Sequence, residues 1–434
     1  MKENILHLVW KYGLLDTLNC YSTDGEKIEI LNLGFHNDSD SGPDFFNAKL
    51  KIGNTIWFGN VEIHYKTSDW FNHLHHLDSF YQSVILHVVY EDDCGHIEGT
   101  KKFPIIELKK CVNPEVWDRI LLIDSSKKKI PCSNYLNKIK PRDWINWQDR
   151  LVVERFEQKV KDVDLFYALN KQDWSKVVFQ LLTKSLGGSV NKEPFLILSR
   201  LVPLEVIKRH RSDLFAIEAI LFGVSGMLNG TFSDLYPRRL QQEYSFYKQK
   251  FNLDEMENYW WKWLRLRPIA FPTIQIAILA SLLYNSTQLE NIFEIKDFES
   301  FKQKIQLSTV LSPYWENHYK FDKASKEKVK NWGIEQITRI FINGVIPYQI
   351  AKKKALGANC FNDIIGKLND LKPENNKIIR IWKGYKVPIS SSYESQAMIE
   401  LYNNYCSRKK CLHCNVGLKF LNQAKYDKVL ERNT

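Results

Sequence analysis

Alternating apolar and polar residues mark several β-strands between residues 21 and 110. The segments KIEILNLG, NAKLKIG, TIWFGNVEIHY, SVILHVVYE and FPIIELK show strand-like alternation, with turns between them. This period of two is that of a strand with one buried face. Ahead of them, one helix face is marked by the spacing of Ile5, Leu6, Val9, Trp10 and Leu14. The pattern predicts a helix, a meander of strands, a short helix or loop over residues 68–82, and further strands.

From Pro141 onward the apolar spacing becomes that of helices. The segment DWSKVVFQLLTKSLGG is delimited at both ends, by a capping Asp173 and by Gly187. The spacing predicts an α+β chain with three parts. Residues 1–135 form a mixed sheet with flanking helices, residues 136–355 form a large all-α region, and residues 356–434 form a helical tail with a cysteine cluster.

The charge balance changes which partners are plausible. The net charge of +11 favours an acidic partner, and nucleic acid is the first candidate. The alternative is a lysine-rich composition without a nucleic-acid partner, since the lysines are spread along the chain. The N-terminus lacks the apolar core of a signal peptide, and the longest apolar run is too short to span a bilayer. We therefore expect a cytoplasmic protein with no membrane partner, and its oligomeric state stays open.

Two acidic positions in the strand region suggest metal chemistry. Asp44 follows Pro43 just before one strand, and Glu62 and His64 lie two residues apart on one face of the next. If these strands pair, the two carboxylates converge and can hold Mg²⁺ or Mn²⁺. Such an ion activates water and offsets charge at a scissile phosphate, while His64 positions or deprotonates the water.

These residues resemble the motif of the PD-(D/E)xK nuclease superfamily. Pro43-Asp44 matches its first element, and Glu62-Ile63-His64 matches its second except that histidine replaces lysine. The resemblance implies a nuclease fold over residues 1–135 that acts on DNA or RNA. It also implies Lys66, two residues beyond His64, and Glu3 on the N-terminal helix as further catalytic residues.

Histidines are concentrated around this motif. Six of the 11 histidines lie between residues 64 and 96. Histidine with aspartate is typical of metal and phosphate sites. The alternative is a polar loop with one buried strand histidine. The residues that we consider as phosphate or second-metal ligands are Asp69, His73, His75, His76 and His87.

The chain as a whole resembles domain-of-unknown-function family 2851, an uncharacterised bacterial family. The segments that carry this resemblance are GPDFFNAKL, GNVEIHYKTSDW, VILHVVY, RLRPIAFPT and YCSRKKCLHCNVG. They extend over nearly the full length. The family implies no activity, so the function is argued from the residues.

Three of the eight cysteines form a cluster in the tail. Cys406, Cys411 and Cys414 have the close spacing of a metal-binding knuckle. A tetrahedral Zn²⁺ or a [4Fe–4S] cluster needs a fourth ligand, which Cys132 or Cys360 can supply. We prefer Cys132, because it would fasten the tail beside the first domain. The spacing does not separate zinc from iron–sulfur.

The leading hypothesis is a metal-dependent nuclease or phosphodiesterase acting through Asp44, Glu62 and His64. The first alternative is a non-catalytic nucleic-acid-binding or assembly protein built on a degenerate nuclease core. The second is a hydrolase such as a phosphatase, in which Asp69, His73, His75 and His87 converge on one metal. The chain has no Walker loop and no G-x-G-x-x-G motif, which argues against an ATP motor or a dinucleotide enzyme.

Overall fold

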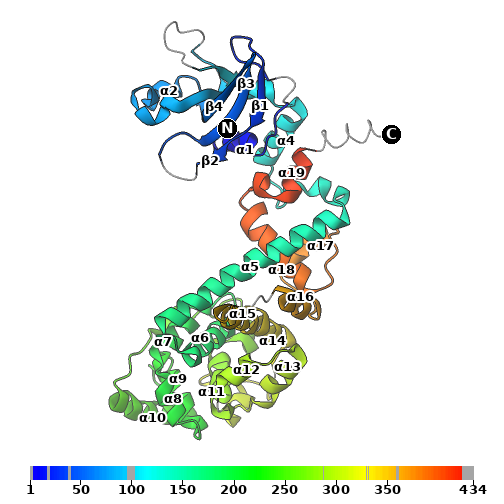
Figure 1. The fold of residues 1–434 in the computed structure, drawn as a ribbon. Coiled ribbons are helices and arrows are strands. Elements are labelled where there is room, and N and C mark those ends of the chain that lie inside the picture. The colour runs from blue at the N-terminus through cyan, green and yellow to red at the C-terminus, as the bar shows by residue number, and fades with distance from the viewer. Residues whose placement is uncertain are drawn as a thin grey trace. The chain divides into compact units, whose positions relative to one another are not determined.

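A six-stranded mixed sheet forms the N-terminal part of the chain (Figure 1). The computed structural model describes residues 3–16, 20–37, 41–94, 103–286, 288–328, 330, 332–357 and 361–422. The strands are β1 (Ile28–Asn32), β2 (Phe35–His36), β3 (Phe45–Ile52), β4 (Thr55–Lys66), β5 (Val84–Glu91) and β6 (Ile105–Glu107). All five predicted strand segments are confirmed, and the short β2 is an addition.

The strand order is β1-β3-β4-β5-β6, with β2 beside β3. β3 pairs antiparallel with β1 and β4, whereas β5 pairs parallel with β4 and β6. A parallel neighbour requires a crossover, and residues 67–83 provide it. This crossover contains α2 (Asp69–Asn72), the 3-10 helices η1 (His75–Leu77) and η2 (Ser79–Ser83), and the predicted short helix region. Most of the histidines of interest lie on β4, on β5 or in the crossover.

The predicted N-terminal helix is confirmed as α1 (Glu3–Lys11), which buries Leu6, Val9 and Trp10. These side chains join a core with residues of β3, β4 and β5. The helices α3 (Leu108–Cys111) and α4 (Pro114–Ser125) and the 3-10 helix η3 (Ser133–Lys138) follow the sheet. Along β4 the burial changes from exposed near Thr55 to continuous between Val61 and His64. This half of β4 is therefore covered on both faces, which encloses the polar Glu62 and His64.

Helices dominate the chain from Pro141 onward, as predicted. They are α5 (Pro141–Leu169), α6 (Trp174–Leu186), α7 (Lys192–Leu201), α8 (Leu204–Arg209), α9 (Leu214–Val224), α10 (Leu235–Phe251), α11 (Pro272–Asn285), α12 (Leu289–Phe293), α13 (Phe298–Leu307), α14 (Ile334–Ile340), α15 (Ile346–Ala355), α16 (Phe361–Asn369), α17 (Lys377–Gly384), α18 (Ser392–Glu400) and α19 (Asn415–Leu421). The expected N-cap of α6 is present, since the Asp173 side chain accepts hydrogen bonds from the amides of Ser175 and Lys176.

The expectation that residues 136–355 are all-α needs one correction. A small antiparallel hairpin of β7 (His318–Lys320) and β8 (Lys323–Ala324) lies within them. Strands of three and two residues are too short to leave an alternation in the sequence.

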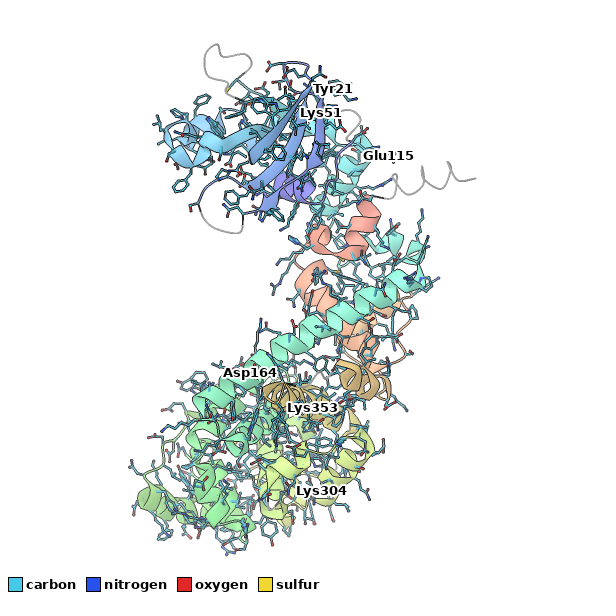
Figure 2. The ribbon with its side chains drawn as sticks, viewed as in Figure 1. Tyr21, Lys51, Glu115, Asp164, Lys304 and Lys353 are labelled. Carbon is cyan, nitrogen blue, oxygen red and sulfur yellow. The ribbon has the colours of Figure 1, made fainter. Side chains whose placement is uncertain are left out.

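The described residues belong to two compact units. The first covers residues 1–147, 384–387 and 400–434, and the second covers residues 148–383 and 388–399. In Figure 2, Lys51 and Glu115 mark the first unit, and Asp164, Lys304 and Lys353 mark the second. The three-domain division at residues 135 and 355 stays a prediction. Of the helices in the described ranges, none combines the length and apolar content that crossing a membrane requires.

Candidate functional site

Asp44 and Glu62 face each other where β3 begins. Phe45 of β3 pairs with Val61 of β4, so the preceding Asp44 lies opposite Glu62. The Asp44 backbone N–H donates to Glu62 Oε2 at 3.1 Å, and the Ile63 N–H donates to Asp44 Oδ2 at 2.9 Å. Each carboxylate is thus oriented by a backbone amide of the other strand.

Both acids lie in an environment that disfavours two negative charges. Glu62 is buried, and about a fifth of the Asp44 side chain is exposed. Burial raises the pKa of both carboxyls well above the usual range, and the charge of Glu62 raises that of Asp44 further. Lys66 does not offset these charges, because its Nζ ion-pairs with Asp93 Oδ2 at 3.7 Å. A divalent cation would supply the compensation that this lysine does not.

Three histidines converge beside Glu62. His64 projects from β4, His73 follows α2, and His75 begins η1. One ligand nitrogen from each lies within 4.8 Å of the other two. Glu62 Oε1 is 3.5 Å from His64 Nε2 and 3.3 Å from His75 Nε2, and His73 Nδ1 is 3.2 Å from His64 Nε2. Three imidazoles therefore surround a common space, and Glu62 Oε1 borders it beside His64 and His75.

The crossover has a specific local structure that turns two of these histidines toward β4. Leu74 adopts a left-handed backbone conformation with φ of 61°, so the chain reverses between His73 and His75. The His75 ring then stacks on Tyr81 with centroids 3.8 Å apart. The buried Trp70 of α2 contacts His75 edge-on at 5.4 Å. Aromatic packing thus fixes the orientation of His75.

His87 of β5 contacts the histidine cluster through His64. Its Nε2 lies 2.8 Å from His64 Nδ1, and both side chains are buried. Burial, together with neighbouring imidazoles, lowers the pKa of His64 to about 2 and that of His87 to about 3. Both rings are therefore neutral at ordinary pH. If His64 Nε2 ligates a metal, its Nδ1–H donates to His87 Nε2, which takes the place of the carboxylate, carbonyl or water that usually accepts this hydrogen bond.

Helix α1 contributes an acid and a further histidine. Glu3 lies close enough to His73, His75 and Asp69 for their charges to affect it, and burial raises its pKa. His7 Nε2 is 3.4 Å from Asp44 Oδ2. That nitrogen is buried and makes no hydrogen bond within the described part of the chain. A buried ring nitrogen of this kind can bind a water molecule or a ligand at the site.

Sequence reasoning missed His7. The sequence feature that could have identified His7 is its four-residue separation from Glu3, which puts both side chains on one face of a helix.

Other predicted residues lie apart from the cluster. The Asp69 carboxylate accepts from the Lys66 amide at 2.9 Å and so closes the turn after β4. His76 is exposed and packs on Phe71 with ring centroids 5.3 Å apart. His96, which contributed to the histidine enrichment, is outside the described residues. The structure brings together Asp44, Glu62, His64, His73, His75 and Glu3, with His87 behind them.

A basic cavity adjoins Asp44. It has a volume of about 880 Å³ and lies within the first unit. Its polar lining includes His7, Lys11, His36, Asp44, Arg408, Lys409, Lys410 and His413. Cationic side chains from the tail thus face the same space as one of the two central acids.

The four candidate cysteine ligands are Cys132, Cys406, Cys411 and Cys414, and all of them are buried in the first unit with free thiols. Cys360, the other predicted fourth ligand, lies outside the described residues. His413 contacts Tyr12 through its Nδ1, 3.4 Å from the tyrosine hydroxyl.

The family model described as "Protein of unknown function (DUF2851)" matches residues 3–377. The matched region contains the Asp44–Glu62 pair, the histidine cluster and Cys132, and it ends before Cys406. No curated protein and no solved structure matches the chain.

Proposed function

We propose that this chain, which belongs to the family of proteins of unknown function DUF2851, is a metal-dependent phosphodiesterase that cleaves DNA or RNA. The observation that carries the proposal is the pairing of the buried carboxylate of Glu62 with the largely buried carboxylate of Asp44, beside converging imidazoles. A bound divalent ion would activate water and offset charge on the phosphate.

The kinds of ligand atom at the site indicate which metal ion it would bind best. Carboxylates alone suit Mg²⁺, whereas imidazole nitrogens favour a transition metal. Glu62 Oε1 lies against two imidazole nitrogens, and His73 completes the group. Of the two ions that the sequence suggested, Mn²⁺ is therefore the better match. In this proposal Asp44 and Glu62 bind the ion together with His64, His73 and His75.

The resemblance to PD-(D/E)xK nucleases enters as support for this proposal. A helix, antiparallel strands bearing Asp44 and Glu62, and a crossover to a parallel strand follow one another along the chain. The motif lysine has no equivalent at the site, since Lys66 pairs with Asp93. His64 contacts other histidines through both ring nitrogens, so its proposed role is to hold metal rather than to activate water. His7, whose Nε2 lies beside Asp44 and makes no hydrogen bond within the described residues, is the better-placed residue to bind the attacking water.

Nucleic acid is favoured as substrate by the basic cavity. Lys11, Arg408 and Lys410 line it on the side of the tail and of α1, and Asp44 lines it as well. Phosphates bound along those cations would bring one phosphodiester toward the acids.

The test is cleavage of single- and double-stranded DNA and RNA with Mn²⁺ or Mg²⁺. Asp44→Asn and Glu62→Gln are each expected to lower the rate by roughly 100-fold or more, the scale of losing one catalytic group. Glu29→Gln is the matched control, because Glu29 is an exposed carboxylate paired with Lys51 on β1 and β3. Circular dichroism checks that each variant is folded. Wild-type protein that cleaves no nucleic acid with either ion would overturn the proposal.

The same assay separates the two alternatives. A non-catalytic binder would retain nucleic-acid affinity in Asp44→Asn and show no cleavage in the wild type. A phosphatase would hydrolyse p-nitrophenyl phosphate in preference to bis-p-nitrophenyl phosphate. The proposed phosphatase site needs Asp69 and His87 as ligands, whereas Asp69 closes a turn and His87 lies behind His64. The geometry therefore favours a phosphodiester over a phosphomonoester as the substrate.

A further inference from the structure

We infer that Cys132, Cys406, Cys411 and Cys414 together bind a second metal centre, distinct from the Asp44–Glu62 site. The four side chains come from two segments separated by more than half the chain. Cys132 precedes η3, Cys406 ends the helical turn η8 (Leu401–Cys406), Cys411 begins η9 (Cys411–His413), and Cys414 precedes α19.

Packing brings these two segments together. The Arg119 guanidinium of α4 donates to the Leu421 carbonyl of α19 at 3.2 Å. The rings of Tyr135 on η3 and Phe420 on α19 lie 5.6 Å apart. Figure 1 shows α19 beside α4. Cys132 and the tail cysteines thus lie on a shared interface within one unit.

The tail loop has the close backbone geometry of a metal-binding knuckle. The Cys414 N–H donates to the Cys411 carbonyl at 3.2 Å, which closes a turn around the two residues between them. Gly417 packs directly onto this turn, since a Cβ there would lie 2.1 Å from the Cys411 carbonyl oxygen. Only glycine fits at that distance, so the chain is held tightly where Cys411 and Cys414 face inward.

The four thiols interact electrostatically. The Cys406 thiol has coulombic interactions with Cys132, Cys411 and Cys414. The Cys132 thiol has such interactions with Cys411 and Cys414. Each of the four is less than a tenth exposed. Buried free thiols from two segments that pack together are the arrangement of a thiolate metal site.

The spacing of the sulfurs favours an iron–sulfur cluster. Zinc held by four thiolates at about 2.3 Å places the sulfurs about 3.8 Å apart. No three of the four sulfurs, all of which belong to described residues, lie within 4.8 Å of one another. A [4Fe–4S] cluster is larger than a single ion and holds its cysteines further apart, so it matches this wider arrangement.

One consequence rests on the function proposed above. Arg408, Lys409 and Lys410 lie between Cys406 and Cys411, and all three line the cavity that Asp44 also lines. Lys409 Nζ also donates to the Asp124 carbonyl of α4. A centre bound by the flanking cysteines would fix the conformation of this basic loop and hence the phosphate-binding side of the cavity.

The test is metal and sulfide analysis, with visible absorption, on full-length protein purified without oxygen. We expect iron and acid-labile sulfide with broad visible absorption. Cys411→Ser and Cys414→Ser should each lose most of it. Cys94→Ser is the matched control, because Cys94 is a half-buried cysteine that contacts Asp93 and is not one of the four proposed ligands. Asp44→Asn should retain the iron, so this readout is independent of nuclease activity.

The other outcomes are decisive. Protein without bound metal, or tail variants that keep as much iron as Cys94→Ser, would overturn the site. One zinc per chain that is lost in Cys414→Ser would support the four-thiolate site and overturn its assignment to iron–sulfur.

Discussion

His75 and His76 are adjacent and chemically identical, yet they have different surroundings. The His75 ring stacks on Tyr81 and places Nε2 3.3 Å from Glu62 Oε1. The His76 ring is exposed and contacts Phe71. Successive residues of a short 3-10 helix project in different directions, so only one of the pair can face the cluster.

This difference gives a prediction at the residue scale. His75→Ala should lower the affinity for Mn²⁺ by at least roughly tenfold, because it removes one of the nitrogens around Glu62. His76→Ala should leave the affinity unchanged within about twofold, since that ring lies outside the cluster. Isothermal titration calorimetry with Mn²⁺ measures both. Equal losses in the two variants would contradict the proposed ligand set.

At the scale of elements, α9 is an almost wholly apolar helix that buries one carboxyl group. Glu218 is fully buried, and its Oε2 accepts hydrogen bonds from Tyr236 of α10 and Ser312, both at 2.6 Å. Burial raises the pKa of Glu218 from 4.5 to about 7, although these hydrogen bonds oppose the shift. The folded second unit therefore binds a proton that the unfolded chain releases at lower pH.

The sign of the pH dependence follows from this shift. Below about pH 4.5 Glu218 is protonated in both the folded and the unfolded chain, so it does not make the free energy of unfolding depend on pH. Between pH 4.5 and 7 the unfolded state loses its proton first, so the free energy of unfolding falls by as much as about 3 kcal/mol and is level above pH 7. Glu218→Gln should remove this decline. Urea denaturation across this pH range measures it, with Glu205→Gln on the exposed face of α8 as control. A decline that persists in Glu218→Gln would assign it to other groups.

At the scale of the whole molecule, the net charge of +11 and the basic cavity suggest electrostatic binding of a polyanion. Arg408 and Lys410 are exposed and line the cavity together with Asp44. Each phosphate contact releases condensed counterions, so affinity for nucleic acid should fall as salt rises.

We expect Arg408→Gln and Lys410→Gln each to reduce the slope of log affinity against log salt by about one. Lys304→Gln should leave the slope unchanged, because Lys304 is an exposed lysine of α13 in the second unit (Figure 2). Fluorescence anisotropy with a labelled oligonucleotide over a range of salt concentrations measures the slopes. The same slope for all three variants would mean that the net charge of the whole chain, and not the cations that line the cavity, attracts nucleic acid.

The sequence by itself determined the local elements and the central acids. Alternating apolar residues specify the strands, because every second side chain of a strand shares one face. The side chain of Asp173 caps α6 for an equally local reason, since it reaches amides only two and three residues ahead. Asp44 beside Pro43 and Glu62 two residues before His64 were recognisable for the same reason, because their positions depend on strand geometry alone.

Only the tertiary structure decided which other side chains join those acids. His73 and His75 reach Glu62 because Leu74 reverses the chain and aromatic rings fix His75. Lys66 lies on the expected strand but pairs with Asp93, a partner 27 residues away that no periodicity predicts. His7 comes from α1, and Cys132 lies 274 residues before Cys406, the first of the tail cysteines. Such contacts depend on how elements pack across the chain, and the sequence pattern carries only the local part of that information.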